Sequence, residues 1–143
     1  MPSRLKIVLD TNVLLVSISS KSKYNWLYLH LLNGDFDLFV SNDIIAEYEE
    51  IISQKFNDST ARNVIKALHS LTNVHLVQIS FKWNLITKDY DDNKFVDCAI
   101  ASNAHFLVTN DQHFQVLKNI MIPTVSIITL EEFIVVMKSF SKI

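Results

Sequence analysis

The sequence predicts an α/β fold in which a five-stranded parallel sheet lies between two layers of helices, a three-layer α/β/α sandwich. Short apolar runs alternate with longer segments of helical periodicity, which is the pattern that successive βα units produce. Crossovers between parallel strands are right-handed in nearly all proteins, and this rule leaves the sandwich as the expected arrangement. The 143 residues are 49% hydrophobic and 20% charged, which suits one packed domain over residues 1–143.

Five apolar runs are the predicted strands, and the segments between them are the predicted helices. The strands span about residues 5–9, 37–41, 74–79, 105–109 and 124–128. The helices span about residues 12–19, 24–33, 42–55, 59–71, 93–104, 111–117 and 130–141. Capping residues mark two of the helix starts, because Ser41–Asp43 and Asp58–Thr60 each precede an apolar run and offer side-chain oxygens to its first amides.

Composition excludes several classes of protein. Gly34 is the only glycine, whereas P-loop NTPases and dinucleotide-binding folds need several glycines after a strand. Cys98 is the only cysteine, so a disulfide framework and a thiolate metal cluster are excluded and a reducing compartment is expected. The formal net charge of -2 gives no general argument for a nucleic-acid partner, so any contact with a polyanion must be local.

The N-terminal apolar run is too short for a secretion signal. Residues 7–9 are followed at once by Asp10, and no apolar run approaches the roughly 18 residues that a membrane span needs. The sequence therefore predicts a cytoplasmic protein that does not associate with membranes.

Four acidic residues are expected at one edge of the sheet. Asp10 and Asp111 follow the first and fourth strands, while Glu47 and Asp97 lie in the early turns of helices. The carboxyl ends of parallel strands and the starts of the helices that follow them share one edge, where ligands bind. Clustered carboxylates repel one another and lose hydration, so this placement predicts a divalent-cation site.

Helical phase sharpens one of these positions. At roughly 100° per residue, Asp97 falls on the apolar stripe of its helix beside Ile100 and Ala104. A carboxylate in that position is costly to bury unless a cation or several donors satisfy it. For the preceding helix, Glu47 and Glu49 flank opposite margins of the stripe, and periodicity does not choose between them.

Lysines and aromatic residues are expected near the same edge. They are Lys21, Lys23, Lys82, Trp83, Lys88, Tyr90 and Lys94. Such a rim can bind phosphates and stack bases, and loop lysines equally often form plain solvated surface. Both interpretations remain open at this point.

Four segments carry a resemblance to a known family: IVLDTNVLL, SNDIIAEYEEII, DDNKFVDCAIAS and HFLVTND. In this order and spacing they resemble the PIN domain, most closely its bacterial branch of VapC-like toxins from toxin–antitoxin pairs. The resemblance extends over essentially the whole chain, including the closing stretch SIITLEEF. It implies strand order 3-2-1-4-5 and a metal-dependent endoribonuclease whose products carry a 5′ phosphate and a 3′ hydroxyl.

The resemblance also implies particular site residues. The family's four acids, which would be catalytic and bind Mg²⁺ or Mn²⁺, match Asp10, Glu47, Asp97 and Asp111. Asn12, Thr109 and Asn110 match polar positions that would touch the site or the substrate, and Asp92 matches a frequent acidic position whose role is not defined. RNA is the implied substrate, and an antitoxin protein and a homodimer are the partners that the resemblance leaves open.

Two other functions remain open. A PIN fold can lose its activity and bind RNA or protein without cutting, although here no member of the acidic quartet is missing. Aspartyl-phosphate phosphatases also place an Asp after the first strand, but they require a second Asp two residues later, where this chain has Asn12.

Overall fold

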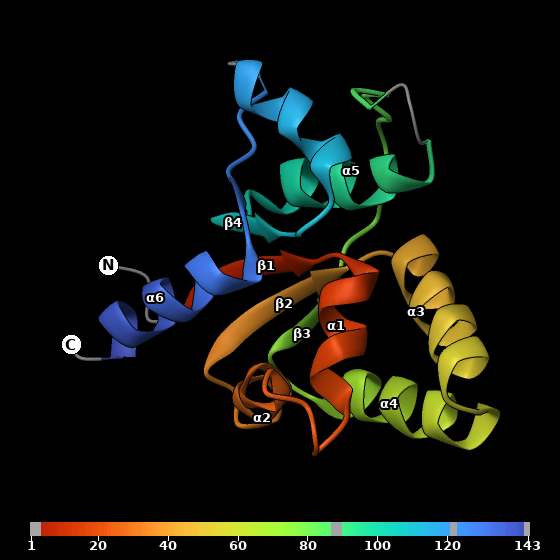
Figure 1. The fold of residues 1–143 in the computed structure, drawn as a ribbon. Coiled ribbons are helices and arrows are strands. Elements are labelled where there is room, and N and C mark those ends of the chain that lie inside the picture. The colour runs from red at the N-terminus through yellow and green to blue at the C-terminus, as the bar shows by residue number, and fades with distance from the viewer. Residues whose placement is uncertain (1–3, 87–89, 121–122, 142–143) are drawn as a thin grey trace.

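The fold is a five-stranded parallel sheet with helices on both faces (Figure 1). The structure, a computed structural model, describes residues 4–86, 90–120 and 123–141. The strands are β1 (Leu5–Leu9), β2 (Phe36–Val40), β3 (Val74–Leu76), β4 (Phe106–Val108) and β5 (Ile127–Ile128). Their order in the sheet is β3-β2-β1-β4-β5, all neighbours are parallel, and the predicted fold class and strand order are confirmed.

The described part of the chain also contains six α-helices and two 3₁₀ segments; all lie between strands except α6, which follows the last strand. The α-helices are α1 (Thr11–Ile18), α2 (Asn25–Leu32), α3 (Asn42–Lys55), α4 (Asp58–Ser70), α5 (Asn93–Ser102) and α6 (Leu130–Ser141). The 3₁₀ segments are η1 (Tyr90–Asp92) and η2 (Gln112–Asn119). No helix of the described residues is long and apolar enough to cross a membrane.

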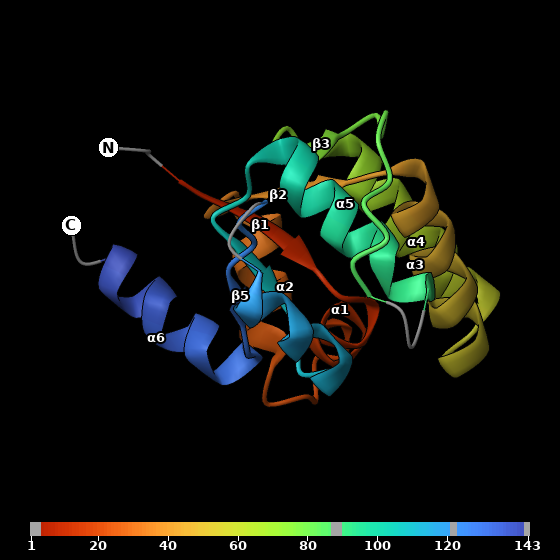
Figure 2. The same cartoon turned by 90° about the horizontal axis from the view of Figure 1, so that it is seen from above.

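The central strand β1 is covered on both faces. Ile7 pairs with Leu38 of β2 and Phe106 of β4, and the side chains of Ile7, Val8 and Leu9 are fully buried. An unbroken run of apolar residues, with no alternation with polar ones, is expected for a strand buried between two helix layers. The layers are α5 on one face, and α1 and α2 on the other (Figures 1 and 2).

The C-terminal helix α6 packs beside α2. The ring of Phe133 lies edge-on to that of Phe36, with centroids 5.5 Å apart, and 6.3 Å from the ring of Trp26. Phe36 and Phe133 are both fully buried. These aromatic contacts join the end of the chain to the start of β2 and extend the core beyond the central strands.

Several predicted boundaries differ from the structure. The third strand ends at Leu76 and not at residue 79, because the backbone beyond Val77 leaves the sheet and bonds to side chains of α5. The fifth strand contains only residues 127–128. The helix after residue 57 is capped by Asn57, whose side chain accepts from the Thr60 amide at 2.7 Å; the predicted capping residues 58–60 lie inside it.

A buried asparagine joins the turn before β3 to β2. The side-chain amide of Asn73, 2% exposed, donates to the carbonyl oxygens of Leu31 at 3.0 Å and Phe36 at 2.8 Å. The backbone carbonyl oxygen of Asn73 accepts from the Leu38 amide at 2.8 Å. The Asn73 side chain therefore ties the end of α2 to the start of β2 through two buried hydrogen bonds.

Replacing Asn73 with alanine should lower the free energy of unfolding by about 1–3 kcal/mol, since two buried hydrogen bonds are lost. Urea denaturation followed by circular dichroism measures the change. Asn63→Ala, at an exposed position of α4, is the matched control and should stay within about 0.5 kcal/mol of the wild type. Equal stability of the two variants would contradict this role for Asn73.

Candidate functional site

Asp10 joins the carboxyl ends of the two central strands. It follows β1, occupies the N-cap position of α1 and is 6% exposed. Its carboxylate oxygen Oδ2 accepts a hydrogen bond of 2.7 Å from the hydroxyl of Thr109, and its amide donates to the Val108 carbonyl at 3.1 Å. The Thr109 hydroxyl oxygen in turn accepts from the Asp111 amide at 3.0 Å. One threonine thus positions both strand-end acids.

Burial and like charges disfavour the ionised form of Asp10. Burial is the largest cause and raises its pKa, while hydrogen bonds from Thr109 and from the Thr11 amide lower it. The carboxylates of Asp111 and Glu47 raise the pKa of Asp10 further. Three of the predicted acids are therefore close enough to repel, and a bound cation would relieve that repulsion.

Glu47 is held between two other elements. Its Oε2 accepts a hydrogen bond from the Thr11 hydroxyl, and its Oε1 lies 2.5 Å from the ammonium of Lys94 on α5. Both charged side chains of the ion pair are about one-fifth exposed, at 22% and 20%. The neighbouring Glu49 and Glu50 are exposed. Glu47 therefore connects α3 to α1 and α5 at the rim of the sheet.

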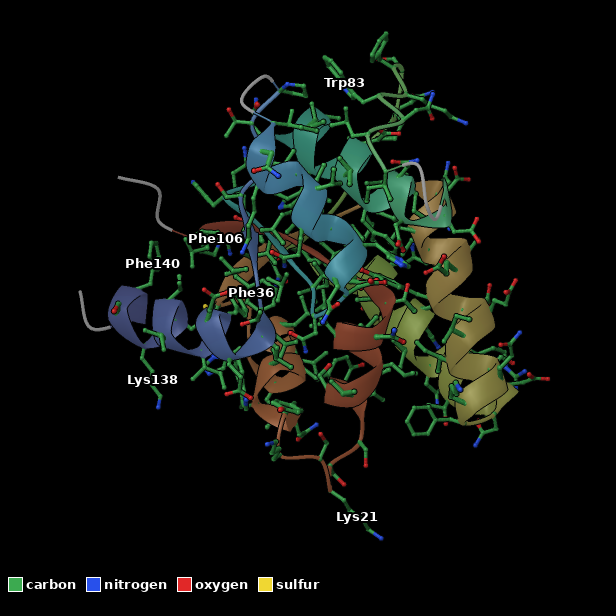
Figure 3. The ribbon with its side chains drawn as sticks, turned by 45° about the horizontal axis from the view of Figure 1, so that its top comes forward. Lys21, Phe36, Trp83, Phe106, Lys138 and Phe140 are labelled. Atoms are coloured by element: carbon green, nitrogen blue, oxygen red, sulfur yellow. The ribbon has the colours of Figure 1, made fainter. Side chains whose placement is uncertain are left out.

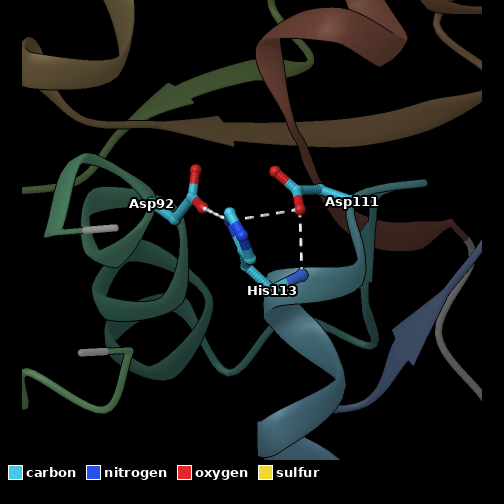
Figure 4. Close-up of side chains that lie close together, drawn as sticks. All are labelled: Asp92, Asp111 and His113. Atoms are coloured by element: carbon cyan, nitrogen blue, oxygen red, sulfur yellow. Dashed lines mark hydrogen bonds and ion pairs between the residues drawn. The ribbon is translucent and has the colours of Figure 1, made fainter. Parts of the chain in front are cut away.

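A second group of metal-binding side chains lies beside Asp111 (Figure 4). One ligand atom each from Asp92, Asp111 and His113 lies within 4.8 Å of the others. The His113 Nδ1 is 3.6 Å from Asp92 Oδ2 and 3.5 Å from Asp111 Oδ1, and the His113 amide donates to Asp111 Oδ1 at 2.9 Å. Oxygen and imidazole ligands at this spacing suit a divalent cation.

Asp97 has other neighbours and does not belong to this group. Its Oδ1 accepts a hydrogen bond of 3.1 Å from the backbone amide of Trp83. One turn earlier on the same face of α5, the Asn93 side chain bonds both backbone groups of Ile86 at 2.8 Å. Burial raises the pKa of Asp97, while the Trp83 amide and the Lys82 ammonium lower it. The Trp83 amide and the charge of Lys82 thus offset part of the cost of burying the Asp97 carboxylate.

The predicted polar residues lie at the same edge with different contacts. Asn12 is exposed in the first turn of α1. The Asn110 side-chain oxygen accepts from the Leu130 amide at 3.1 Å, so Asn110 tethers the start of α6. Of the lysines, Lys21 projects from the end of the molecule opposite Trp83 (Figure 3), and Lys88 lies outside the described residues.

From the sequence, His113 was expected to have a surface or capping role, and Thr11 was not expected at the site. His113 lies two residues after a predicted acid, and Thr11 one residue after another, so adjacency was the available signal. Adjacency does not say that Thr11 bonds Glu47, which is 36 residues away, or that His113 faces Asp92. These contacts depend on how α3 and α5 pack against the sheet.

The metal-free Asp10→Asn variant should be more stable than the wild type at neutral pH. The folded state holds the Asp10 proton more tightly than the unfolded chain, so stability linked to this group is complete below its ordinary pKa of 3.8 and is lost as the pH rises through the raised value. The gain should shrink to nothing at pH 3.8 and below. Thermal unfolding in chelator across this pH range measures it, and a less stable variant at neutral pH would contradict the electrostatic account.

Comparison with known proteins identifies the family. The PIN domain model matches residues 6–113 of the chain. A search of curated proteins gives no match. Among solved structures, the VapBC2 complex of Rickettsia felis, bound to a promoter DNA fragment, has a chain 21% identical with a TM-score of 0.59. The alignment covers 87% of this chain and 98% of that one.

Two further structures share the fold at lower identity. VapC20 of Mycobacterium tuberculosis, a toxin that cleaves the sarcin–ricin loop, is 11% identical with a TM-score of 0.57, covering 76% of this chain and 92% of that one. The PIN domain endonuclease Utp24 is 16% identical with a TM-score of 0.55, covering 90% and 86%. With its matched sequence and its sheet order, this chain belongs to the PIN domain family.

Proposed function

We propose that this protein is a metal-dependent endoribonuclease that hydrolyses RNA phosphodiester bonds. The observation that supports this most is the electrostatic state of Asp10, a buried carboxylate that faces the repulsion of Asp111 and Glu47. A protein gains nothing in stability from such an arrangement, so a functional reason for it is expected. Family membership, the cleavage of the sarcin–ricin loop by VapC20 and the endonuclease activity of Utp24 support the same reaction.

The donors at this edge fit Mg²⁺ or Mn²⁺. They are carboxylate oxygens of Asp10, Asp92 and Asp111, with the single imidazole of His113. Hard oxygen ligands favour these ions, and an imidazole is compatible with Mn²⁺. When bound, such an ion makes water more acidic and offsets charge on the scissile phosphate.

Asp10 and Asp111 are the proposed ligands from the central strands, because Thr109 fixes both of them. From the start of α5 we assign Asp92, which lies beside Asp111 and His113. Asp97 was predicted for this role from its place in the early turns of a helix, from helical phase and from the family resemblance. We propose instead that Asp97 holds the backbone at Trp83 in place by accepting from its amide.

Glu47 contributes by orientation and charge. Its two carboxylate oxygens are engaged by Thr11 and Lys94. We therefore assign it the task of holding a water that contacts the ion, and not a direct bond to the ion. Lys94 balances part of the negative charge and stands where a phosphate oxygen of the substrate would be attracted.

The proposal extends to a protein partner. The solved structures that share the fold include the VapBC complex of Salmonella typhimurium and the FitAcB complex of Neisseria gonorrhoeae, matched at 15% identity with TM-scores of 0.54 and 0.57. We infer that this chain is the toxin of a toxin–antitoxin pair. Its growth-arresting effect in cells, relieved by co-expression of the adjacent gene product, is the corresponding test.

Asp10→Asn and Asp111→Asn should each lower the rate of RNA cleavage by more than about 100-fold, above the 10–100-fold typical of residues that act through a ligand. The measurement is the cleavage of a labelled RNA in Mn²⁺, with chelator as the metal-free reference. Glu47→Gln should also lose activity, and the exposed Glu49→Gln on the same helix is its matched control. Full activity in chelator or in both aspartate variants would show that this edge of the sheet is not a metal-dependent nuclease site.

The two acids of the α5 region can be separated by metal affinity. Asp92→Asn should weaken Mn²⁺ binding by about 10-fold or more, because it removes a charge beside Asp111. Asp97→Asn should leave that affinity unchanged, since an amide oxygen can still accept from Trp83. Electron paramagnetic resonance of free Mn²⁺ reads binding without catalysis. The reverse ranking of the two variants would return the metal-ligand role to Asp97.

A further inference from the structure

The segment of residues 77–86, here named the strap, is held against α5 by side chains and not by a neighbouring strand. The Val77 amide makes the last bond to the sheet, to the Val40 carbonyl at 2.7 Å. Asp97 then binds the Trp83 amide, and Asn93 binds both backbone groups of Ile86. Three hydrogen bonds from one face of α5 thus fix the path of the strap, and its last residue, Ile86, is buried.

The fixed strap presents two aromatic rings to solvent. Phe81 is 62% exposed and Trp83 is 38% exposed, and their ring centroids are 4.7 Å apart at an interplanar angle of 71°. Trp83 stands at the outer limit of the molecule (Figure 3). Lys82 lies between the two aromatic residues in sequence and is also exposed. Exposed aromatic rings on an anchored backbone, next to a cation, indicate a binding surface and not a packing surface.

A cavity of about 300 Å³ lies between the strap, α3 and α5. All of its lining residues except Ile79 have polar or charged side chains, and they include Lys82, Asn84, Asn93, Lys94 and Asp97. The volume falls at the lower end of the range for small-ligand pockets. Asn93 is engaged by Ile86, but the Asn84 amide and the second carboxylate oxygen of Asp97 can bond the edge of a nucleobase, and the two lysines can contact its phosphates.

The cavity shares lining residues with a depression at the proposed catalytic edge. Lys94, Asp43 and Asp91 also line a neighbouring depression that contains Glu47. Lys94 is thus common to the cavity under the strap and to the Glu47 ion pair. A chain that crosses the catalytic edge would meet the strap next.

We propose that the strap binds unpaired nucleotides of RNA adjacent to the bond that is cut, with Phe81 and Trp83 stacking on bases and the cavity receiving one base edge. This inference rests on the proposed function for the identity of the polymer. Bases in a duplex are stacked on one another and are closed to such rings, whereas unpaired bases can be splayed onto them. The strap would therefore select single-stranded or looped RNA over duplex.

Binding is tested separately from cleavage. In an Asp10→Asn background, a short fluorescein-labelled RNA of mixed sequence is titrated by anisotropy, single-stranded or annealed to its complement. Phe81→Ala and Trp83→Ala should each weaken binding of the single strand by about 10-fold, as for other base–aromatic stacks. Phe56→Ala, 44% exposed at the far end of α3, is the matched control and should leave it unchanged. With Trp26→Phe, Trp83 becomes the only tryptophan, and its fluorescence should be quenched by the single strand.

The outcomes distinguish this inference from the proposed function. Loss of RNA affinity in the strap variants supports the inference even if the wild-type protein cuts no RNA. Cleavage by the wild type, with unchanged RNA affinity in both strap variants or equal affinity for the duplex, overturns it while the nuclease function stands. If the same variants lose self-association on gel filtration but keep their RNA affinity, the strap is a protein interface and the inference is wrong.

Discussion

The hydroxyl of Thr109 is the constraint on which the proposed site depends. It donates to the Asp10 carboxylate and accepts from the Asp111 amide, so it fixes the distance between the ends of β1 and β4. Thr109 is 2% exposed and lies where both strands are fully buried. The acids are consequently held by the sheet itself and need no metal to bring them together. Rigid support of this kind is what a catalytic constellation requires.

Two acids at this edge of the sheet are held in surroundings that disfavour their ionised forms. Burial and neighbouring carboxylates raise the pKa of Asp10, and burial raises that of Asp97. The surrounding structure compensates each acid differently. Asp97 receives the Trp83 amide and lies near the Lys82 ammonium, whereas Asp10 receives the Thr109 hydroxyl and the Thr11 amide but is opposed by the carboxylates of Asp111 and Glu47. This contrast is the physical reason to place an ion at Asp10 and a structural role at Asp97.

The sequence predicted what depends on strand ends and on helical periodicity, and missed what depends on how distant segments pack together. Asp10 and Asp111 were placed at one edge because parallel strands share their carboxyl ends, and both acids flank Thr109 there. On α5, periodicity showed that Asp97 faces inward, but it did not show that the strap folds back to meet it. The strap itself was predicted partly as strand, since residues 77 and 79 are apolar and nothing local signals the departure from the sheet. Long-range contacts such as Thr11 with Glu47 depend on helix docking and have no local pattern.

The ion pair between Lys94 and Glu47 bears on how folding and metal uptake would be related. In the folded structure this internal counter-ion offsets part of the repulsion among the acids, and a core that includes fully buried Tyr48, Phe95 and Phe114 stabilises the fold. Small zinc domains fold only as they take up their ion, so in them folding and loading are a single event. In the proposed nuclease the counter-ion is part of the chain, so folding would not require the dication and would precede its uptake.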